Sequence, residues 1–212
     1  LLALNIPDNK SLSGYIYQAL NSLYEKTVII NNEQVNKNEI SSVTNKARVN
    51  VIELILNKKE GEYSSTSAEG TIYDSFKTSI DKNYEIVDKI KECFLNNNKN
   101  KLELYDLVEM LKSAPYGMRD GVIPLFVAKA FSDLLVINND IIKTIILYNR
   151  DLEIPMNALN LCKALAYPEQ YNISFEEINH DKILMINELL SLFNCKASDS
   201  FSDNVLNLVS AI

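Results

Sequence analysis

The chain has 212 residues, 47% of them hydrophobic, a formal net charge of -7 and a pI near 4.9. This is enough apolar material for one large core or two small ones, while the negative charge opposes non-specific attraction to nucleic acid. Glycine and proline number five each, which disfavours a many-turned β-sandwich and predicts long helices joined by polar loops.

The N-terminal part predicts helices separated by polar connectors. The first helix, 11–26, places Leu12, Ile16, Ala19, Leu20 and Leu23 on one stripe. Residues 27–39 are β-prone and then rich in asparagine, which predicts a short strand or an extended connector. Further helices are expected at 41–59, 71–80 and 83–97, with a polar Gly/Ser/Thr loop at 60–71.

The central part has the element order of a winged-helix domain. Helices at 83–97, 102–113 and 121–135 are followed by a β-prone run at 141–149, the turn pair Arg150 and Asp151, and a return strand at 152–155. This order predicts a winged-helix-like unit with a small β-hairpin. A generic helical packing with an attached hairpin is the alternative, because the turn between the second and third helices is long.

The last part predicts a helix at 156–170 stopped at Pro168, an extended segment at 171–175, a helix at 176–194 and a final amphipathic helix at 199–212. The expected fold class is therefore mostly α: a multi-helix domain with a winged-helix-like unit and a small β-hairpin. The expected division is an N-terminal helical subdomain 1–80, the winged-helix-like unit 81–155 and C-terminal helices 156–212. One continuous domain is the alternative.

Residues 113–131, "SAPYGMRDGVIPLFVAKAF", concentrate two glycines and two prolines within ten residues. A phosphate-binding P-loop is excluded because the stretch has no Lys-Ser or Lys-Thr pair and no preceding strand. The dinucleotide pattern G-x-G-x-x-G fails on spacing. The residues fit a corner between two helices better.

In that corner, each special residue has an expected structural task. Pro115 ends the preceding helix, Gly117 takes a positive φ, Asp120 accepts N–H bonds at the next helix start, and Pro124 lies in or beside the first turn. Arg119 alone has no such task. It either pairs with an acidic neighbour (Asp106, Glu109 or Asp120) or points outward to a partner.

No catalytic, cofactor-binding or metal-binding residue is predicted. Cys93, Cys162 and Cys195 are widely separated, lack zinc-ligand spacing and fit reduced thiols of a cytoplasmic protein. His180, the only histidine, fits a solvated helix start, and Glu176 and Glu177 fit favourable charge at the same helix N-terminus. Glu103, Asp106 and Glu109 share a helical face as ordinary surface charges do. No apolar run approaches the length of about 18 residues that a membrane-spanning helix needs.

A DNA-reading winged helix would present Arg, Lys, Asn or Gln from its third helix. Between 121 and 135 the polar side chains are only Lys129, Ser132 and Asp133, while the hairpin adds Lys143 and Arg150. Lys129, Lys143 and Arg150 are the candidate nucleic-acid contacts. Packing or protein contact is the favoured use of the unit.

Three patterns in order resemble segments of very large bacterial P-loop ATP-binding proteins of anti-phage defence regions. "IINNEQVNKNEISSVTNKARVNVIELIL" followed by "EGTIYDSF" resembles an N-E-x-[IV]-N-[RK] core before an Ala-Arg helix, and "APYGMRDGVIP" resembles a P-[YF]-G-[LM]-[RK]-x-G-x-[IV]-P element. "ILYNRDLEIP" with "LAYPEQYNIS" is similar to the hairpin and Pro-Glu segment that follow. The likeness covers roughly residues 15–175. The matched positions are Asn32, Glu33, Asn36, Arg48, Tyr116, Gly117, Arg119 and Gly121.

The sequence departs from the family pattern at Gln34 and Val35 and in having the single Pro115 before Tyr116. The resemblance implies a helical module beyond the nucleotide-binding domain, and it gives the matched positions no roles. No cofactor is expected. The expected function is a non-catalytic interaction or regulatory module, bound to the parent ATPase or to a partner protein. The start without Met and the end within an apolar pattern fit an excised fragment. Candidate partner contacts are Arg119, Tyr116, Glu33, Asn36 and Arg48. The alternative is a nucleic-acid-binding winged-helix domain.

Overall fold

The computed structural model describes residues 12–28, 30, 32, 35–39, 44–58, 64, 66–96, 101–135, 141–197 and 201–211. Within these ranges the chain is mostly helical with a small antiparallel sheet, which confirms the predicted fold class. The elements up to the corner are α1 (Leu12–Leu23), α2 (Thr44–Leu56), α3 (Ala68–Lys82), α4 (Tyr84–Asn96), β1 (Leu102–Glu103) and α5 (Leu104–Lys112). After the corner come α6 (Ile123–Leu134), β2 (Ile141–Asn149), β3 (Leu152–Ile154), α7 (Ala158–Ala166), the short helix η2 (Pro168–Gln170), β4 (Tyr171–Asn179), α8 (His180–Leu192) and α9 (Phe201–Ala211).

Helix α6 forms the centre of the core. Its sequence is apolar on nearly every side, as expected of a helix that other helices surround, and it packs against α2, α4 and α7. The Phe126 ring meets Phe76 edge-on with ring centroids 5.5 Å apart, and Phe131 meets Phe94 at 4.9 Å. Because one buried cluster runs from Val28 to Phe175, it crosses both sequence positions, 80 and 155, at which subdomain boundaries are predicted.

The sheet has the strand order β1-β4-β2-β3, and every neighbouring pair is antiparallel. The predicted hairpin is present as β2 and β3, with Arg150 at φ 57° in its turn. The longer partner of β2 is β4, which pairs with it from Asn149 opposite Tyr171 to Ile141 opposite Asn179.

The prediction of a helix over 176–194 is wrong at its start, because the helix begins at His180 and the preceding residues belong to β4. Ile173 and Phe175 are buried on one face of the strand, so the alternation of a half-buried strand continues where a helix start was expected. Glu176 and Glu177 of β4 therefore lie opposite Thr144 and Lys143 of β2 and not at a helix N-terminus.

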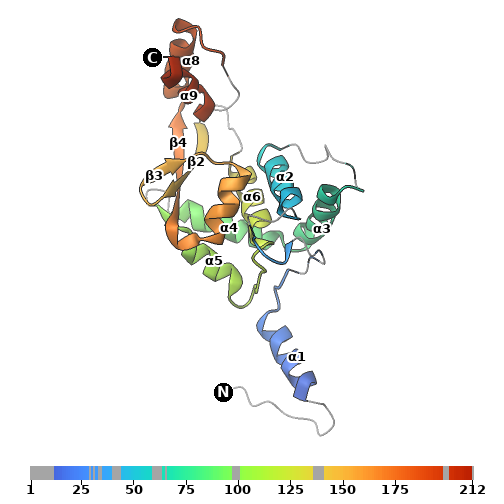
Figure 1. Ribbon diagram of the computed structural model, residues 1–212. Helices are drawn as coiled ribbons and strands as arrows, with labels where there is room; N and C mark the ends of the chain where they lie inside the picture. The colour runs from blue at the N-terminus through green and yellow to red at the C-terminus, as the bar shows by residue number, and fades with distance from the viewer. Residues whose placement is uncertain are drawn as a thin grey trace.

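The molecule is elongated. Figure 1 shows α1 projecting from one end of the helical body, while α8 and α9 lie together at the opposite end, beyond the ribbon of β2 and β4. The predicted stripe of α1 is present but faces solvent, because Ile16, Leu20 and Leu23 are each about half exposed, as is the neighbouring Tyr17. Among the described residues, α1 on one side and α8 with α9 on the other thus lie outside the main core.

Candidate interaction site

The corner between α5 and α6 has the geometry that its glycine and second proline predict. Gly117 has a φ of 53°, a left-handed conformation that favours glycine. Pro124 lies in the first turn of α6, where its missing N–H leaves no hydrogen bond unmade. The corner is tied to the end of α5 by the Met118 N–H, which donates to the Leu111 carbonyl at 2.9 Å.

The expected capping role of Asp120 is wrong. The N-cap position of α6 is Val122, which lacks a side-chain cap hydrogen bond. Asp120 forms an ion pair with Lys112 at 2.7 Å instead, so its carboxylate faces back toward the end of α5. The N–H groups of Val122 and Ile123 at the start of α6 already have an acceptor, because they donate to the Arg119 carbonyl at 2.9 and 3.3 Å.

The connector that follows α1 lies directly on this corner. The Lys26 N–H donates to the Pro115 carbonyl at 3.1 Å. A Cβ on Gly117 would lie 2.7 Å from the Tyr24 ring, and a Cβ on Gly121 would lie 2.3 Å from the Val35 carbonyl oxygen. Both glycines are therefore required by close approach of the connector. Sequence reasoning missed this contact, because nothing in the spacing indicates that residues so far apart meet.

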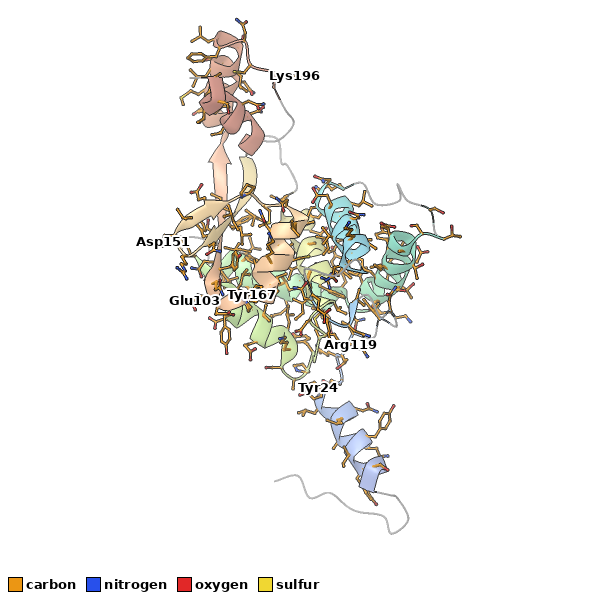
Figure 2. All side chains as sticks on the ribbon, in the orientation of Figure 1. Tyr24, Glu103, Arg119, Asp151, Tyr167 and Lys196 are labelled. Carbon is orange, nitrogen blue, oxygen red and sulfur yellow. The ribbon has the colours of Figure 1, made fainter. Side chains whose placement is uncertain are left out.

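Arg119 of the corner also contacts the connector, on the solvent-exposed side. Its Nη1 donates to Asn36 Oδ1 at 2.6 Å, across 83 positions of sequence, and both side chains are exposed. The acidic neighbours considered from the sequence are not its hydrogen-bond partners. Figure 2 shows Tyr24 where α1 joins the body, and Arg119 in the body beyond it.

Arg48 anchors the connector from inside. Its side chain is fully buried, with Nη1 donating to the Lys37 carbonyl at 2.7 Å and Nη2 to Asn38 Oδ1 at 2.6 Å. Asn38 in turn donates to the Cys162 carbonyl at 2.8 Å, which links α2, the connector and α7.

The electrostatic setting of Arg48 is unusual, because the oxygens that its Nη atoms contact are neutral, its other partner is the Cys162 thiol, and its Nε has no hydrogen-bond partner. Burial lowers the pKa of Arg48, although an arginine keeps its charge at neutral pH. Burial also raises the pKa of the Cys162 thiol to about 11, with the nearby Arg48 opposing that shift. The cluster therefore combines a buried cation with a thiol that stays protonated at neutral pH.

Of the other sequence candidates, Tyr116 lies in the corner itself, three lie on α6 or in the hairpin, and Glu33 lies outside the described residues. Tyr116 is half-buried against the core, and Glu33 is outside the described residues. Lys129 lies on α6 and pairs with Asp133 at 3.0 Å. Arg150 is exposed in the turn of the hairpin. Lys143 has its backbone in β2, and its side chain is outside the described part.

Asp133 also accepts a hydrogen bond from the Tyr84 hydroxyl, which joins α4 to α6. This bond, together with burial, raises the pKa of Tyr84 to about 12. Asp133 already pairs with Lys129 and accepts a hydrogen bond from Tyr84. A nucleic-acid phosphate that binds Lys129 would therefore have to displace the Asp133 carboxylate.

Within the described ranges, no group of three or more His, Cys, Asp or Glu side chains is placed to hold a metal ion. The three cysteines are free thiols. None of the described helices has both the length and the apolar character needed to cross a bilayer.

Comparison with known proteins adds no relative: a scan against family models, a search of curated proteins and a search of solved structures each find no match.

Proposed function

We propose that this chain is a non-catalytic interaction or regulatory module of a very large bacterial ATPase associated with anti-phage defence, and that it works in the cytoplasm. The observation that carries the proposal is the meeting of two separated motifs. The connector motif contributes Asn36 and the corner motif contributes Arg119 and Gly121, and these residues contact across the fold.

The contacts of these motif residues support a positioning role. Gly121 leaves space for the connector backbone. On the solvent side Arg119 donates a hydrogen bond to the connector, and on the core side Arg48 does the same. Together they fix residues 35–38 of the connector, while the Lys26 N–H, which donates to the Pro115 carbonyl at 3.1 Å, ties the chain just after α1 to the corner. A module that holds a projecting helix in a defined place is suited to present that helix to another protein.

Helix α1 has the surface of a docking helix. Within Leu12–Leu23 it carries no charged residue, and its exposed apolar side chains recur at helical spacing, as in helices that lie in an apolar groove. The partner that we propose is the parent ATPase domain or a protein bound to it. Charge steering contributes little to such a contact, because a charge-free helix has no ionic partner to select.

Purified chain and purified parent ATPase domain test the proposal by isothermal titration. The double variant Ile16→Glu/Leu20→Glu should weaken binding at least tenfold, since it places charges on the apolar face. Leu152→Glu is the matched control, because Leu152 is 75% exposed and lies in β3, away from α1. Equal binding by the double variant would exclude α1 as the contact, and absence of binding by the unsubstituted chain would contradict the proposal.

The same preparation tests the non-catalytic part of the proposal. Phosphate release from ATP should not rise above the buffer rate when the chain is added alone. Sustained turnover by the purified chain would contradict that part.

The nucleic-acid alternative stays a prediction, and so does the winged-helix interpretation of α4, β1, α5, α6 and the hairpin. Its clearest candidate contact, Lys129, is already paired with Asp133. Retention of DNA or RNA at low salt that falls steeply as salt rises would favour this alternative.

A further inference from the structure

The core-facing side of α2 changes from polar to apolar along the helix. Ile52 and Ile55 are fully buried, and at the same helical spacing one and two turns earlier lie Arg48 and Asn45, which are 0% and 4% exposed. Buried polar side chains in folded proteins almost always have a hydrogen-bond partner. The first turn of α2 is therefore a place where the core requires hydrogen-bond acceptors.

Two donors at this place lack an acceptor within the described ranges. Asn45 Nδ2 and Arg48 Nε are shielded from solvent, and neither has a hydrogen-bond partner. The two residues are three apart on the helix, so their side chains are neighbours on one face. Long side chains of a helix lean toward its N-terminus, which places the Arg48 side chain over the turn that carries Asn45. One acceptor between them can therefore serve both donors.

The charge at the same place is positive. The Nη atoms of Arg48 donate to the Lys37 carbonyl and to Asn38 Oδ1, which are neutral, and its other neighbour is the Cys162 thiol. In the part of the chain that the structure describes, no carboxylate pairs with Arg48. A buried cation without a counter-ion is strongly unfavourable. An acceptor that is also negatively charged would satisfy both the donors and the charge.

We propose that Asn45 Nδ2 and Arg48 Nε bind one halide ion, chloride under physiological conditions, in the core beside the first turn of α2. A chloride ion accepts a hydrogen bond from each nitrogen and compensates the guanidinium charge. A water molecule would accept the same two hydrogen bonds but would leave the charge uncompensated. Because both donors are shielded from solvent, the site selects a monatomic ion over a large organic anion.

The ion should stabilise the connector together with α2. The guanidinium that would hold it also holds Lys37 and Asn38, and Asn38 donates to the Cys162 carbonyl of α7. The two donors are brought together only by the folded helix, so the folded chain binds the ion and the unfolded chain does not. Binding should therefore raise stability by mass action. This inference concerns the interior of the helical body and does not depend on the proposed function.

Thermal unfolding of the full chain, followed by circular dichroism, tests the inference. Sodium gluconate is replaced by sodium chloride at constant ionic strength. For a Kd on the order of 10 mM, an increase in chloride from about 3 to about 300 mM should raise the midpoint by about 4 °C or more along a saturating curve. Absence of a chloride-dependent rise in the unsubstituted chain would overturn the inference, with water as the acceptor.

Three variants locate the effect. Asn45→Leu removes one donor at similar volume and should retain less than half of the rise, and Arg48→Met removes the charge and should abolish it. Thr27→Val is the matched control, because Thr27 Oγ1 is also buried without a partner but lies beside Gly117 in the corner, and it should show the full rise. A rise in Asn45→Leu as large as in the unsubstituted chain would overturn the site, even where Arg48→Met does not fold.

Bromide gives a direct view of the same site. Crystals of the full chain grown in sodium bromide should show an anomalous scattering peak within hydrogen-bond distance of both Asn45 Nδ2 and Arg48 Nε. A water molecule at this position without anomalous signal, or bromide found only elsewhere, would overturn the inference.

Discussion

At the scale of single residues, the corner depends on two glycines for different reasons. Gly117 needs a left-handed backbone and space beside the Tyr24 ring, whereas Gly121 needs space beside the Val35 backbone. A side-chain ring can move aside, but a backbone carbonyl cannot move without shifting the connector.

We expect Gly121→Ala to lower the free energy of unfolding by about 2 kcal/mol or more, since the added Cβ overlaps a backbone oxygen. Gly117→Ala should cost about 1–2 kcal/mol from its left-handed φ, plus the overlap with Tyr24. Urea unfolding in a Tyr24→Ala background separates the two cases. The Tyr24 part of the Gly117→Ala cost should disappear there, and the Gly121→Ala cost should persist. Similar relief at both glycines would contradict the assigned contacts.

Cys162 gives a pH dependence whose sign follows from its raised pKa. The folded state holds the thiol proton up to about pH 11, whereas an unfolded cysteine loses it from about pH 9. Between these values the unfolded chain binds fewer protons than the folded one, so the free energy of unfolding decreases as pH rises.

This group should contribute a loss on the order of 2–3 kcal/mol between pH 8 and pH 11. Urea midpoints of the unsubstituted chain and of Cys162→Ala, compared at pH 8, 9 and 10, isolate the effect from other titrating groups. The two proteins should differ in slope and converge in stability as pH rises. Parallel pH profiles would mean that the thiol titrates normally.

At the scale of elements, hydrophobic periodicity predicts where the helices lie in the sequence. It does not predict whether the apolar face of each helix is buried against other elements. The α1 stripe reads like a core stripe, yet its side chains are exposed, because burial depends on what the rest of the chain brings alongside. The start of α8 was misplaced for a related reason: β4 extends to Asn179 because β2 pairs with it, and pairing between distant segments leaves no local signal.

The candidate site shows the same limit. The turn chemistry of Gly117 and Pro124 followed from local rules, whereas the contact of Gly121 with Val35 and the bond of Arg119 to Asn36 did not. The buried position of Arg48 was also unpredictable, because a fully buried arginine is rare and its oxygen partners belong to the irregular connector.

We expect α1 and α6 to differ strongly in amide hydrogen exchange. A helix of 12 residues without cover is marginal in water, so α1 should exchange with little protection, while α6, surrounded by α2, α4 and α7, should exchange only on global unfolding. Exchange measured by mass spectrometry at peptide resolution checks this. Protection in α1 equal to that in α6 would mean that α1 is covered in solution.

At the scale of the whole molecule, the division into 1–80, 81–155 and 156–212 and its alternative, one continuous domain, both stay predictions. One buried cluster extends from Val28 to Phe175, and we use it to predict how this part of the chain unfolds. Phe94 and Phe131 join α4 to α6, and Leu161 of α7 belongs to the same buried cluster. Replacing a residue of this cluster should therefore weaken the elements from α2 to β4 together, whereas α1, α8 and α9 lie outside it.

Phe131→Ala and Leu161→Ala should each lower stability by about 2–5 kcal/mol while preserving a single transition. Because the chain lacks tryptophan, circular dichroism and the fluorescence of its 11 tyrosines are the suitable probes. Coincident curves from both probes support one unit. Two separated transitions, with each substitution affecting only one, would support independent subdomains.

The pairing of β2 with β4 also sets an order of events during synthesis. β2 leaves the ribosome first, and its main partner follows only after β3, α7 and η2 have emerged. Until then "IIKTIILYN" offers an apolar, β-prone edge that only the short β3 can shield. The nascent chain therefore passes through a period in which β2 has formed without its main partner β4. This is the stage at which a chaperone would be most needed.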